Sequence, residues 1–206
     1  MRACFCALLL LPWLGPAAAA TRAFAIDSSA SSVRIHVGKT GIGSFAGHEH
    51  EVVARSVHGE VAADFEDLPR SSVEVLVDAS SLTVVAEGEP EGDAPKIERE
   101  MKGPHVLRAT RYPSIRFRSR QVAGKQLSAG SYDLSVAGDL SLHGAVRPIV
   151  VPLQVELRGD ALTGTGKLVV KQTDFGIEPT MAAGGLVKVE DEVTVTFRIV
   201  ARAGGP

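Results

Sequence analysis

The sequence predicts a mainly all-β domain, built either as a sandwich or as an up-and-down barrel, with one short helix. Three observations lead to this prediction. From Ile26 onward the apolar residues recur with a period of two, which is typical of antiparallel strands that bury one face. Glycine and proline separate these apolar runs at short intervals, as they do between consecutive strands. One acidic stretch rich in Gly and Pro interrupts the pattern, and a helical segment follows it.

The first twenty residues have the features of a secretory signal peptide. Arg2 supplies a positive charge, an apolar run extends from Ala3 to Leu14, and small residues lead up to Ala20. We expect cleavage after Ala20, or as late as Ala25. The apolar run is shorter than the roughly 20 residues that cross a bilayer, so no integral membrane span is expected. The mature domain is therefore expected at residues 21–206, in the periplasm or secreted.

The expected strands occupy most of the mature chain. Alternating apolar residues mark three of them, at Val33 to Val37, Val73 to Val77 and Ile115 to Phe117. Further runs of the same kind are Val57 to Phe65, Tyr132 to Leu142, Ile149 to Leu157, Leu162 to Lys171 and Val187 to Val200. Eight or nine strands at this spacing suit a sandwich or a barrel.

The short helix is expected from Lys96 to Lys102. Asp93 is the candidate N-cap, and Gly103 ends the segment. Ile97 and Met101 lie four residues apart and would form its apolar face. A strand pattern interrupted once by a helix fits a barrel with a lid or plug.

Cysteine content, charge and the absence of catalytic motifs exclude several classes of function. Cys4 and Cys6 both lie in the expected signal peptide, so the mature domain is expected to have neither disulfides nor thiolate chemistry. The formal net charge is −2 and no Lys/Arg-rich run occurs, which argues against a nucleic-acid partner. No GxSxG elbow, Walker loop or Rossmann glycine motif is present. The sequence gives no indication of an enzyme.

His48 and His50 are the candidates for a metal site. In "SFAGHEHEV" they are two residues apart, so on a strand they would face the same side and share a metal with a third histidine. The available third ligands are His36, His58 and His143. This spacing alone fixes no third ligand, and exposed histidines beside a glycine-rich turn commonly bind backbone or water. Metal binding is therefore the alternative hypothesis.

Six segments, in order along the chain, resemble the YceI-like family of exported lipid-binding or polyisoprenoid-binding proteins. They are "AIDSSASSVRIHV", "GSF", "LPRSSVEVLVDASSL", "RYPSIRFRS", "VAGDLSLHGAVRPIVVPLQVE" and "KQTDFGI". The resemblance implies an eight-stranded antiparallel lipocalin-like barrel, with the helix near one mouth and a long pocket for an isoprenoid or other amphiphilic lipid. It also implies a tight turn at His143-Gly144 and a structural role for His143.

Three stretches depart from the usual pattern of that family. One is the segment "IEREMKGPHVLRATRYP", with His105, Val106 and Leu107 where the family usually has aromatic residues. The others are the acidic insert "AEGEPEGDAP" from Ala86 to Pro95 and the histidine-rich "GHEHE". The first two fall near the expected mouth of the pocket.

The strand pattern and the resemblance together predict a lipid site. Its apolar wall is expected to include Val33, Ile35, Val37, Phe45, Val75, Val77, Ile97, Met101, Ile115, Phe117, Leu140 and Phe175. His48 and His50 are expected to contact a polar head group at the mouth. The leading hypothesis is an exported carrier or sequestering protein without catalytic residues, whose only cofactor-like group is a bound isoprenoid or fatty-acyl lipid. A barrel with a filled interior that acts through its surface is a third interpretation.

Overall fold

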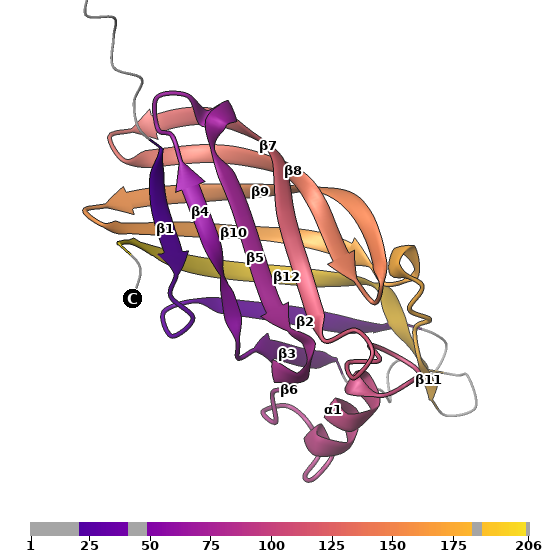
Figure 1. The fold of residues 1–206 in the computed structure, drawn as a ribbon. Helices are drawn as coiled ribbons and strands as arrows, with labels where there is room; N and C mark the ends of the chain where they lie inside the picture. The colour runs from indigo at the N-terminus through magenta and orange to yellow at the C-terminus, as the bar shows by residue number, and fades with distance from the viewer. Residues whose placement is uncertain (1–20, 41–48, 183–186, 205–206) are drawn as a thin grey trace, which may run out of the picture.

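The computed structural model describes residues 21–40, 49–182 and 187–204. Most of this chain is β-strand, and one α-helix, α1, spans Ala94–Lys102 (Figure 1). The strands are β1 (Arg22–Ile26), β2 (Ser32–Thr40), β3 (His50–Ala54), β4 (Val57–Ala63), β5 (Ser72–Asp78), β6 (Leu82–Val84), β7 (Ser114–Ser128), β8 (Ser131–Leu142), β9 (Ala145–Arg158), β10 (Ala161–Lys171), β11 (Met181–Ala182) and β12 (Val187–Ala203). Within the described ranges, no helix is both long and apolar enough to cross a membrane.

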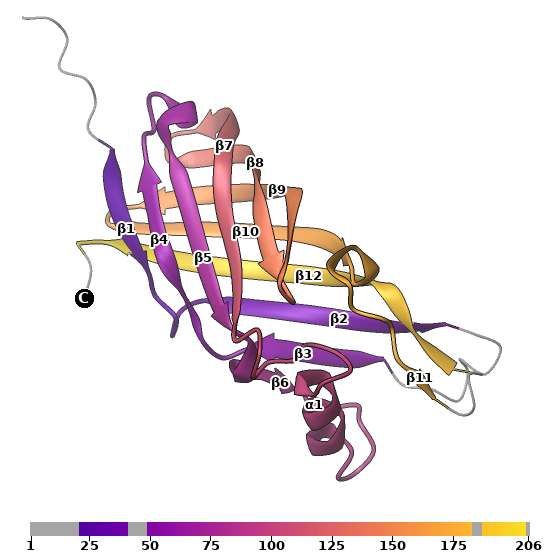
Figure 2. The same ribbon diagram turned by 45° about the vertical axis from the view of Figure 1, so that its right-hand side comes forward.

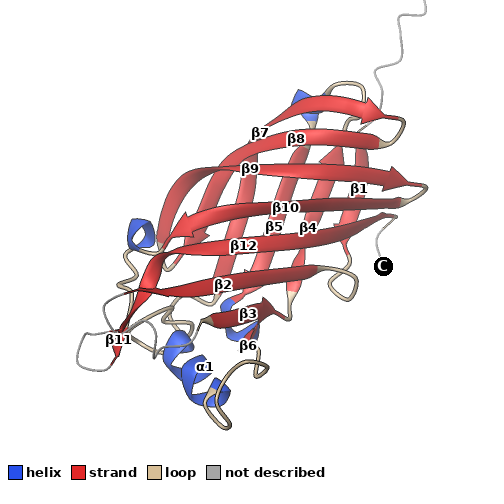
Figure 3. Ribbon diagram, turned by 180° about the vertical axis from the view of Figure 1, so that it is seen from behind, coloured by secondary structure: helices blue, strands red, loops and turns tan. Residues whose placement is uncertain are grey.

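Eight of these strands close into an antiparallel barrel. Their order around the ring is β1-β4-β5-β7-β8-β9-β10-β12, and β1 pairs with β12 to complete it. From behind, the long strands β7, β8, β9, β10 and β12 form the near wall and β1, β4 and β5 form the far wall (Figure 3). The predicted eight-stranded antiparallel barrel with one helix is confirmed. The sandwich is excluded, because two separate sheets would not join through the β1–β12 pairing.

On one side of the barrel, three strands are each interrupted by a short break. The two parts of the first are β1 and β2, which both pair with β12; those of the second are β3 and β4, and those of the third are β5 and β6. The breaks lie side by side, because the backbone N–H of Val57 donates to Ser28 Oγ (3.1 Å) and that of Ser56 donates to Ser81 Oγ (3.2 Å). On the far side of these breaks, β2, β3 and β6 extend the sheet away from the closed ring, and we call these three strands the flap (Figure 2). In the flap, β6 pairs with β3 and not with β7.

Helix α1 packs against the flap. Ala94 is buried in one cluster with Val52, Leu82 and Val84, and the side chains of Ile97 and Met101 pack against that cluster. The predicted apolar face of the helix is therefore confirmed, and the helix lies at the end of the barrel that β6 leaves without a second partner strand (Figure 1).

The helix begins two residues before the predicted Lys96. Asp93 occupies the N-cap position, but its carboxylate makes no capping hydrogen bond. It pairs instead with Lys96 Nζ at 2.8 Å, in the first turn of the helix. Gly103 follows the last helical residue, as the sequence predicts.

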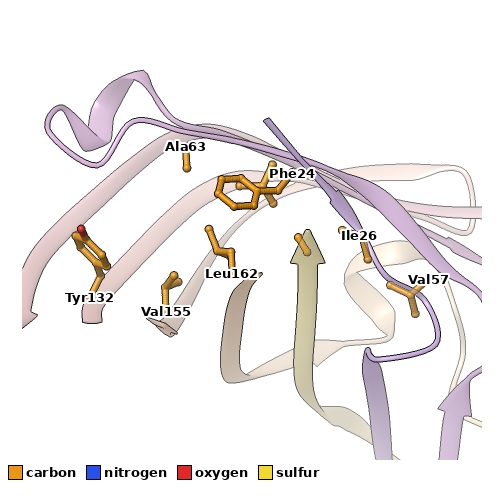
Figure 4. Packing of buried hydrophobic residues seen from close by; sticks show 9 residues of the cluster. Phe24, Ile26, Val57, Ala63, Tyr132, Val155 and Leu162 are labelled. Carbon is orange, nitrogen blue, oxygen red and sulfur yellow. The ribbon is translucent and has the colours of Figure 1, made fainter. Parts of the chain in front are cut away.

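The other end of the barrel is closed by aromatic side chains. The ring of Phe24 meets that of Phe65 edge-on at 6.3 Å, and Phe65 lies 5.5 Å from the ring of Tyr132. Phe24 and Tyr132 belong to the buried cluster in Figure 4, which also includes Ile26, Val57, Ala63, Val155 and Leu162. Asp64 holds the loop that carries Phe65, because its Oδ1 accepts two backbone N–H groups of that loop at 2.9 and 3.1 Å.

Candidate functional site

The barrel interior contains an apolar cavity of about 350 Å³. Side chains from all eight strands of the ring line it. It extends from Phe65 and Leu68 at the closed end to Val106 and Leu107 in the segment after α1. Small-molecule sites in proteins occupy roughly 300–1,000 Å³, so the cavity is large enough for a ligand. The interior of this barrel is hollow and not filled by side chains.

Nine of the fourteen predicted site residues line the cavity. They are Val33, Ile35, Val37, Val75, Val77, Met101, Ile115, Phe117 and Leu140. Three others lie elsewhere among the described residues: Ile97 packs between α1 and the flap, Phe175 is buried beside the wall, and His50 lies at the start of β3. Phe45 and His48 lie outside the described residues.

Polar groups are scarce on the cavity wall. Among the described residues that line it, those with polar side chains are Ser71, Tyr132 and Gln172. Ser71 Oγ donates to a backbone carbonyl of its own loop at 3.3 Å, and Gln172 Nε2 donates to the Glu190 carbonyl at 2.8 Å. Tyr132 Oη lies 3.4 Å from Gln126 Nε2 and accepts a hydrogen bond from it. The wall therefore suits an apolar chain and presents little that would hold a polar one.

Strands β9 and β10 separate along part of the wall. Their pairing extends only to Gly166 opposite Leu153, although β9 runs on to Ala145 at its other end. Pro148 and Pro152 lie in the part of β9 that pairs with β8 but not with β10, and neither has an N–H group to donate to β10. The two prolines explain why the ladder stops there.

The segment after β10 fills the space beside these separated strands. Phe175 and Ile177 are each 3% exposed, and their cluster includes Leu142 of β8, Ala145 of β9 and Leu168 of β10. Ile177 lines the cavity, whereas Phe175 is buried behind it and supports the wall without lining the cavity.

Hydrogen bonds to Asp191 hold this segment in place. The backbone N–H of Thr173 donates to Asp191 Oδ1 at 2.8 Å, and Thr173 Oγ1 donates to Oδ2 at 2.7 Å. These bonds stabilise the charged carboxylate and keep the pKa of Asp191 below its ordinary value.

His143 has the structural role that the family resemblance implied. It forms the turn between β8 and β9 with Gly144, and both residues have positive φ angles, 52° and 78°. Such a two-residue turn matches the twist of the paired strands. His143 Nδ1 donates to the carbonyl oxygen of Phe175 at 3.1 Å, so the turn also holds the segment that completes the wall.

A pair of ionisable side chains lies at the end of the cavity beside α1. His50 is on the same face of β3 as Val52 and Ala54, which line the cavity. Its Nδ1 lies 2.7 Å from Oε1 of Glu89. The side chain of Glu89 is only 2% exposed, and its Oε2 is buried without a hydrogen-bond partner among the described residues. Sequence reasoning missed Glu89, since it sits in an acidic insert whose pattern does not distinguish a buried carboxylate from its exposed neighbours.

The described histidines do not converge on a metal site. In the part of the chain that the structure describes, no three His, Cys, Asp or Glu side chains are placed to hold a metal ion. His36 Nδ1 lies 2.6 Å from Glu51 Oε1, and His58 Nε2 lies 2.8 Å from Ser56 Oγ. His143 and His50 have the separate partners given above. The alternative hypothesis of a histidine-based metal site gains no support from these contacts.

The sequence matches a known family model and several curated relatives. The family model is described as a YceI-like domain, and it matches residues 24–201. A UPF0312 protein of Vibrio cholerae is 30% identical over 140 residues, which are 64% of this chain and 66% of the relative. A UPF0312 protein of Vibrio parahaemolyticus is 26% identical over the same shares of the two chains. The chain thus spans slightly less than two thirds of the length of these relatives.

Solved structures share the fold. BcnA of Burkholderia cenocepacia is 22% identical with a TM-score of 0.65, and the match covers 85% of this chain and 98% of that one. A polyisoprenoid binding domain from Saccharophagus degradans, implicated in plant cell wall breakdown, is 16% identical with a TM-score of 0.64. That match covers 88% of this chain and 99% of the domain. At these identities the likeness establishes the architecture.

Proposed function

Because the chain belongs to the YceI-like family, we propose that it binds an isoprenoid or another amphiphilic lipid inside the barrel. The proposed role is that of an exported carrier or sequestering protein. The observation that carries the proposal is the cavity of about 350 Å³ with an almost wholly aliphatic and aromatic wall. The name of the Saccharophagus degradans domain, which has the same fold and is described as polyisoprenoid binding, supports this choice of ligand class.

The two ends of the cavity differ in a way that favours one orientation of the ligand. Phe24, Phe65 and Tyr132 close one end with aromatic rings. At the other end, beside α1, the His50–Glu89 pair lies next to Val37, which lines the cavity. An amphiphile would therefore place its apolar tail toward Phe65 and its head group toward α1.

The driving force for such binding is the burial of apolar surface. Each methylene group transferred from water contributes about 0.8 kcal/mol, so ten of them contribute about 8 kcal/mol. That free energy corresponds to a dissociation constant near 1 μM before the cost of association is subtracted. A tail of more than ten carbons is thus needed for firm binding, and isoprenoid chains meet that requirement.

The proposal assigns no catalytic residue. The few polar side chains on the described wall are engaged with protein partners, and none stands beside a base or an acid that would activate it. Export is supported by the signal-peptide features of residues 1–20 alone.

The test of lipid binding uses native mass spectrometry of protein purified from its own host, followed by uptake of added ubiquinone. Val75→Trp places a large ring inside the cavity, and Val150→Trp makes the same change on the outer face of β9, where Val150 is 59% exposed. We expect co-purified lipid on the wild type and on Val150→Trp, and at least tenfold weaker ubiquinone uptake by Val75→Trp.

Circular dichroism and thermal melting of all three proteins show whether the Val75→Trp barrel is intact. A wild-type protein that is reproducibly empty and takes up no ubiquinone would refute the proposal. Undiminished uptake by a folded Val75→Trp variant would place the ligand outside the cavity.

A further inference from the structure

Glu89 is a buried carboxylate with one unused acceptor. Its side chain is 2% exposed, Oε1 pairs with His50 Nδ1 at 2.7 Å, and Oε2 has no partner among the described residues. A buried carboxylate oxygen without a hydrogen bond is strongly destabilising, because it has lost its water and gained nothing in return. A hydrogen-bond donor supplied by a ligand would satisfy it.

The position of the pair places this acceptor at the end of the cavity. His50 precedes Val52 on the cavity face of β3, and Val37, which lines the cavity, is its partner on β2. Glu89 reaches His50 from the insert between β6 and α1. Neither His50 nor Glu89 belongs to the cavity wall itself, so a head group that emerges from the cavity beside α1 would extend past Val37 and Val52 to meet the Glu89 carboxylate.

The insert that carries Glu89 is acidic. Residues 86–93 contain four carboxylates and no basic side chain. The nearest lysines of α1 are already paired, Lys96 with Asp93 at 2.8 Å and Lys102 with Glu98 at 2.7 Å. Close to the insert, these carboxylates repel a phosphate or carboxylate head group and attract a cation or a hydrogen-bond donor.

We propose that Glu89, held by His50, is the head-group site of this protein, and that it selects amphiphiles with a hydrogen-bond-donating head, an amine before a hydroxyl, over those with a phosphate or carboxylate. This inference rests on the proposed lipid-binding function and narrows its ligand class. Because Glu89 lies in the insert between β6 and α1, the selectivity would come from the insert and not from the strands of the barrel.

The test compares three probes that share one isoprenoid tail: farnesylamine, farnesol and farnesyl phosphate. Isothermal titration calorimetry measures their binding to the wild-type protein, to Glu89→Gln and to the matched control Glu87→Gln. Glu87 is an exposed carboxylate of the same insert, so its substitution makes the same change in net charge.

For the wild type we expect farnesylamine to bind at least tenfold more tightly than farnesyl phosphate, with farnesol between them, since hydrogen bonds to charged groups have effects of about this size. Glu89→Gln should reduce the ratio of the two affinities to about threefold or less, while Glu87→Gln should preserve it. If Glu89→Gln does not fold, Glu89→Asp keeps the charge and withdraws the oxygens from the head group, so the ratio should also fall.

Three results would overturn the inference. Equal affinities for the three probes, or tightest binding of farnesyl phosphate, would remove the selectivity while leaving lipid binding in place. If the ratio of farnesylamine affinity to farnesyl phosphate affinity falls equally in Glu89→Gln and Glu87→Gln, the selectivity comes from the general charge of the insert and not from Glu89. Failure of every probe to bind would overturn the proposed function together with the inference.

Discussion

Replacing Phe24 with alanine tests the aromatic closure of the barrel. Phe24 is 1% exposed, and its ring contacts the edge of Phe65 at a centroid distance of 6.3 Å. The guanidinium of Arg22 lies 5.0 Å from the same ring. The substitution removes all of these contacts at once and leaves a space at the closed end, next to the proposed position of the lipid tail.

The expected loss follows from the burial of this ring. Removing a buried phenylalanine side chain costs about 3–5 kcal/mol, because the transfer free energy is lost and the surroundings fill the space only in part. We expect about 4 kcal/mol here, since Phe24 is fully buried and has an aromatic partner. A natural domain has about 5–15 kcal/mol of stability in total, so most of the molecules remain folded at 25 °C. The midpoint of thermal unfolding should fall by about 8–16 °C.

The assay is urea unfolding followed by circular dichroism, with thermal melting as a second measurement. The control is Leu127→Ala, which shortens a side chain that is 53% exposed on β7 and should change stability by less than about 0.5 kcal/mol. A loss below about 1 kcal/mol for Phe24→Ala, or a loss equal to that of the control, would refute the role of this ring in closing the barrel.

Two further predictions concern backbone strain and acid stability. Gly144→Ala should destabilise the protein by about 1–3 kcal/mol in urea unfolding, because φ is 78° and the new Cβ would lie 2.5 Å from the ring of Tyr112. The control Gly159→Ala, where φ is 60° and the new Cβ would meet open space, should destabilise it less. An equal loss of stability in both variants would show that the contact with Tyr112 has no effect. Hydrogen bonds from Ser29 lower the pKa of Asp27 from 3.8 to about 2, so its carboxylate stabilises the fold above pH 3.8 and this stability is lost as the pH falls toward 2. Asp27→Asn should therefore flatten the decline of the melting temperature over that range, and an unchanged slope would contradict the assignment.

The strands were largely predictable because their side-chain pattern is local. The predicted Val57 to Phe65 corresponds to β4, Tyr132 to Leu142 to β8, and Leu162 to Lys171 to β10, each with ends within two residues. Strand β7 was underestimated: the sequence marked only Ile115 to Phe117, whereas the strand runs from Ser114 to Ser128. Most of its second half is exposed on both faces, so the apolar alternation that reveals a strand is missing there.

The candidate site was predictable only in part, for a related reason. Val75 and Ile115 were assigned to the cavity wall because alternation gives the face of a strand, and they line the cavity. No alternation pattern reveals the position of Phe175. Its place beside the wall depends on the prolines of β9 and on the hydrogen bond from His143, 32 residues away in sequence, to the Phe175 carbonyl oxygen. Glu89 depends on His50, which is 39 residues away.

By itself the sequence determined the positions and faces of the longer strands, the helix that interrupts them and the family to which the chain belongs, but it missed β1, β3, β6 and β11. The strands and the helix follow from the short-range periodicity of apolar residues. The family follows from segments that resemble it and occur in its order along the chain. The tertiary structure decided that the ring closes through β1 and β12, that the interior is hollow, and that one carboxylate of the acidic insert is buried at the end of the cavity. Each of these depends on which distant residues meet, and the packing of non-local neighbours determines both the empty volume of a barrel and the burial of a charge.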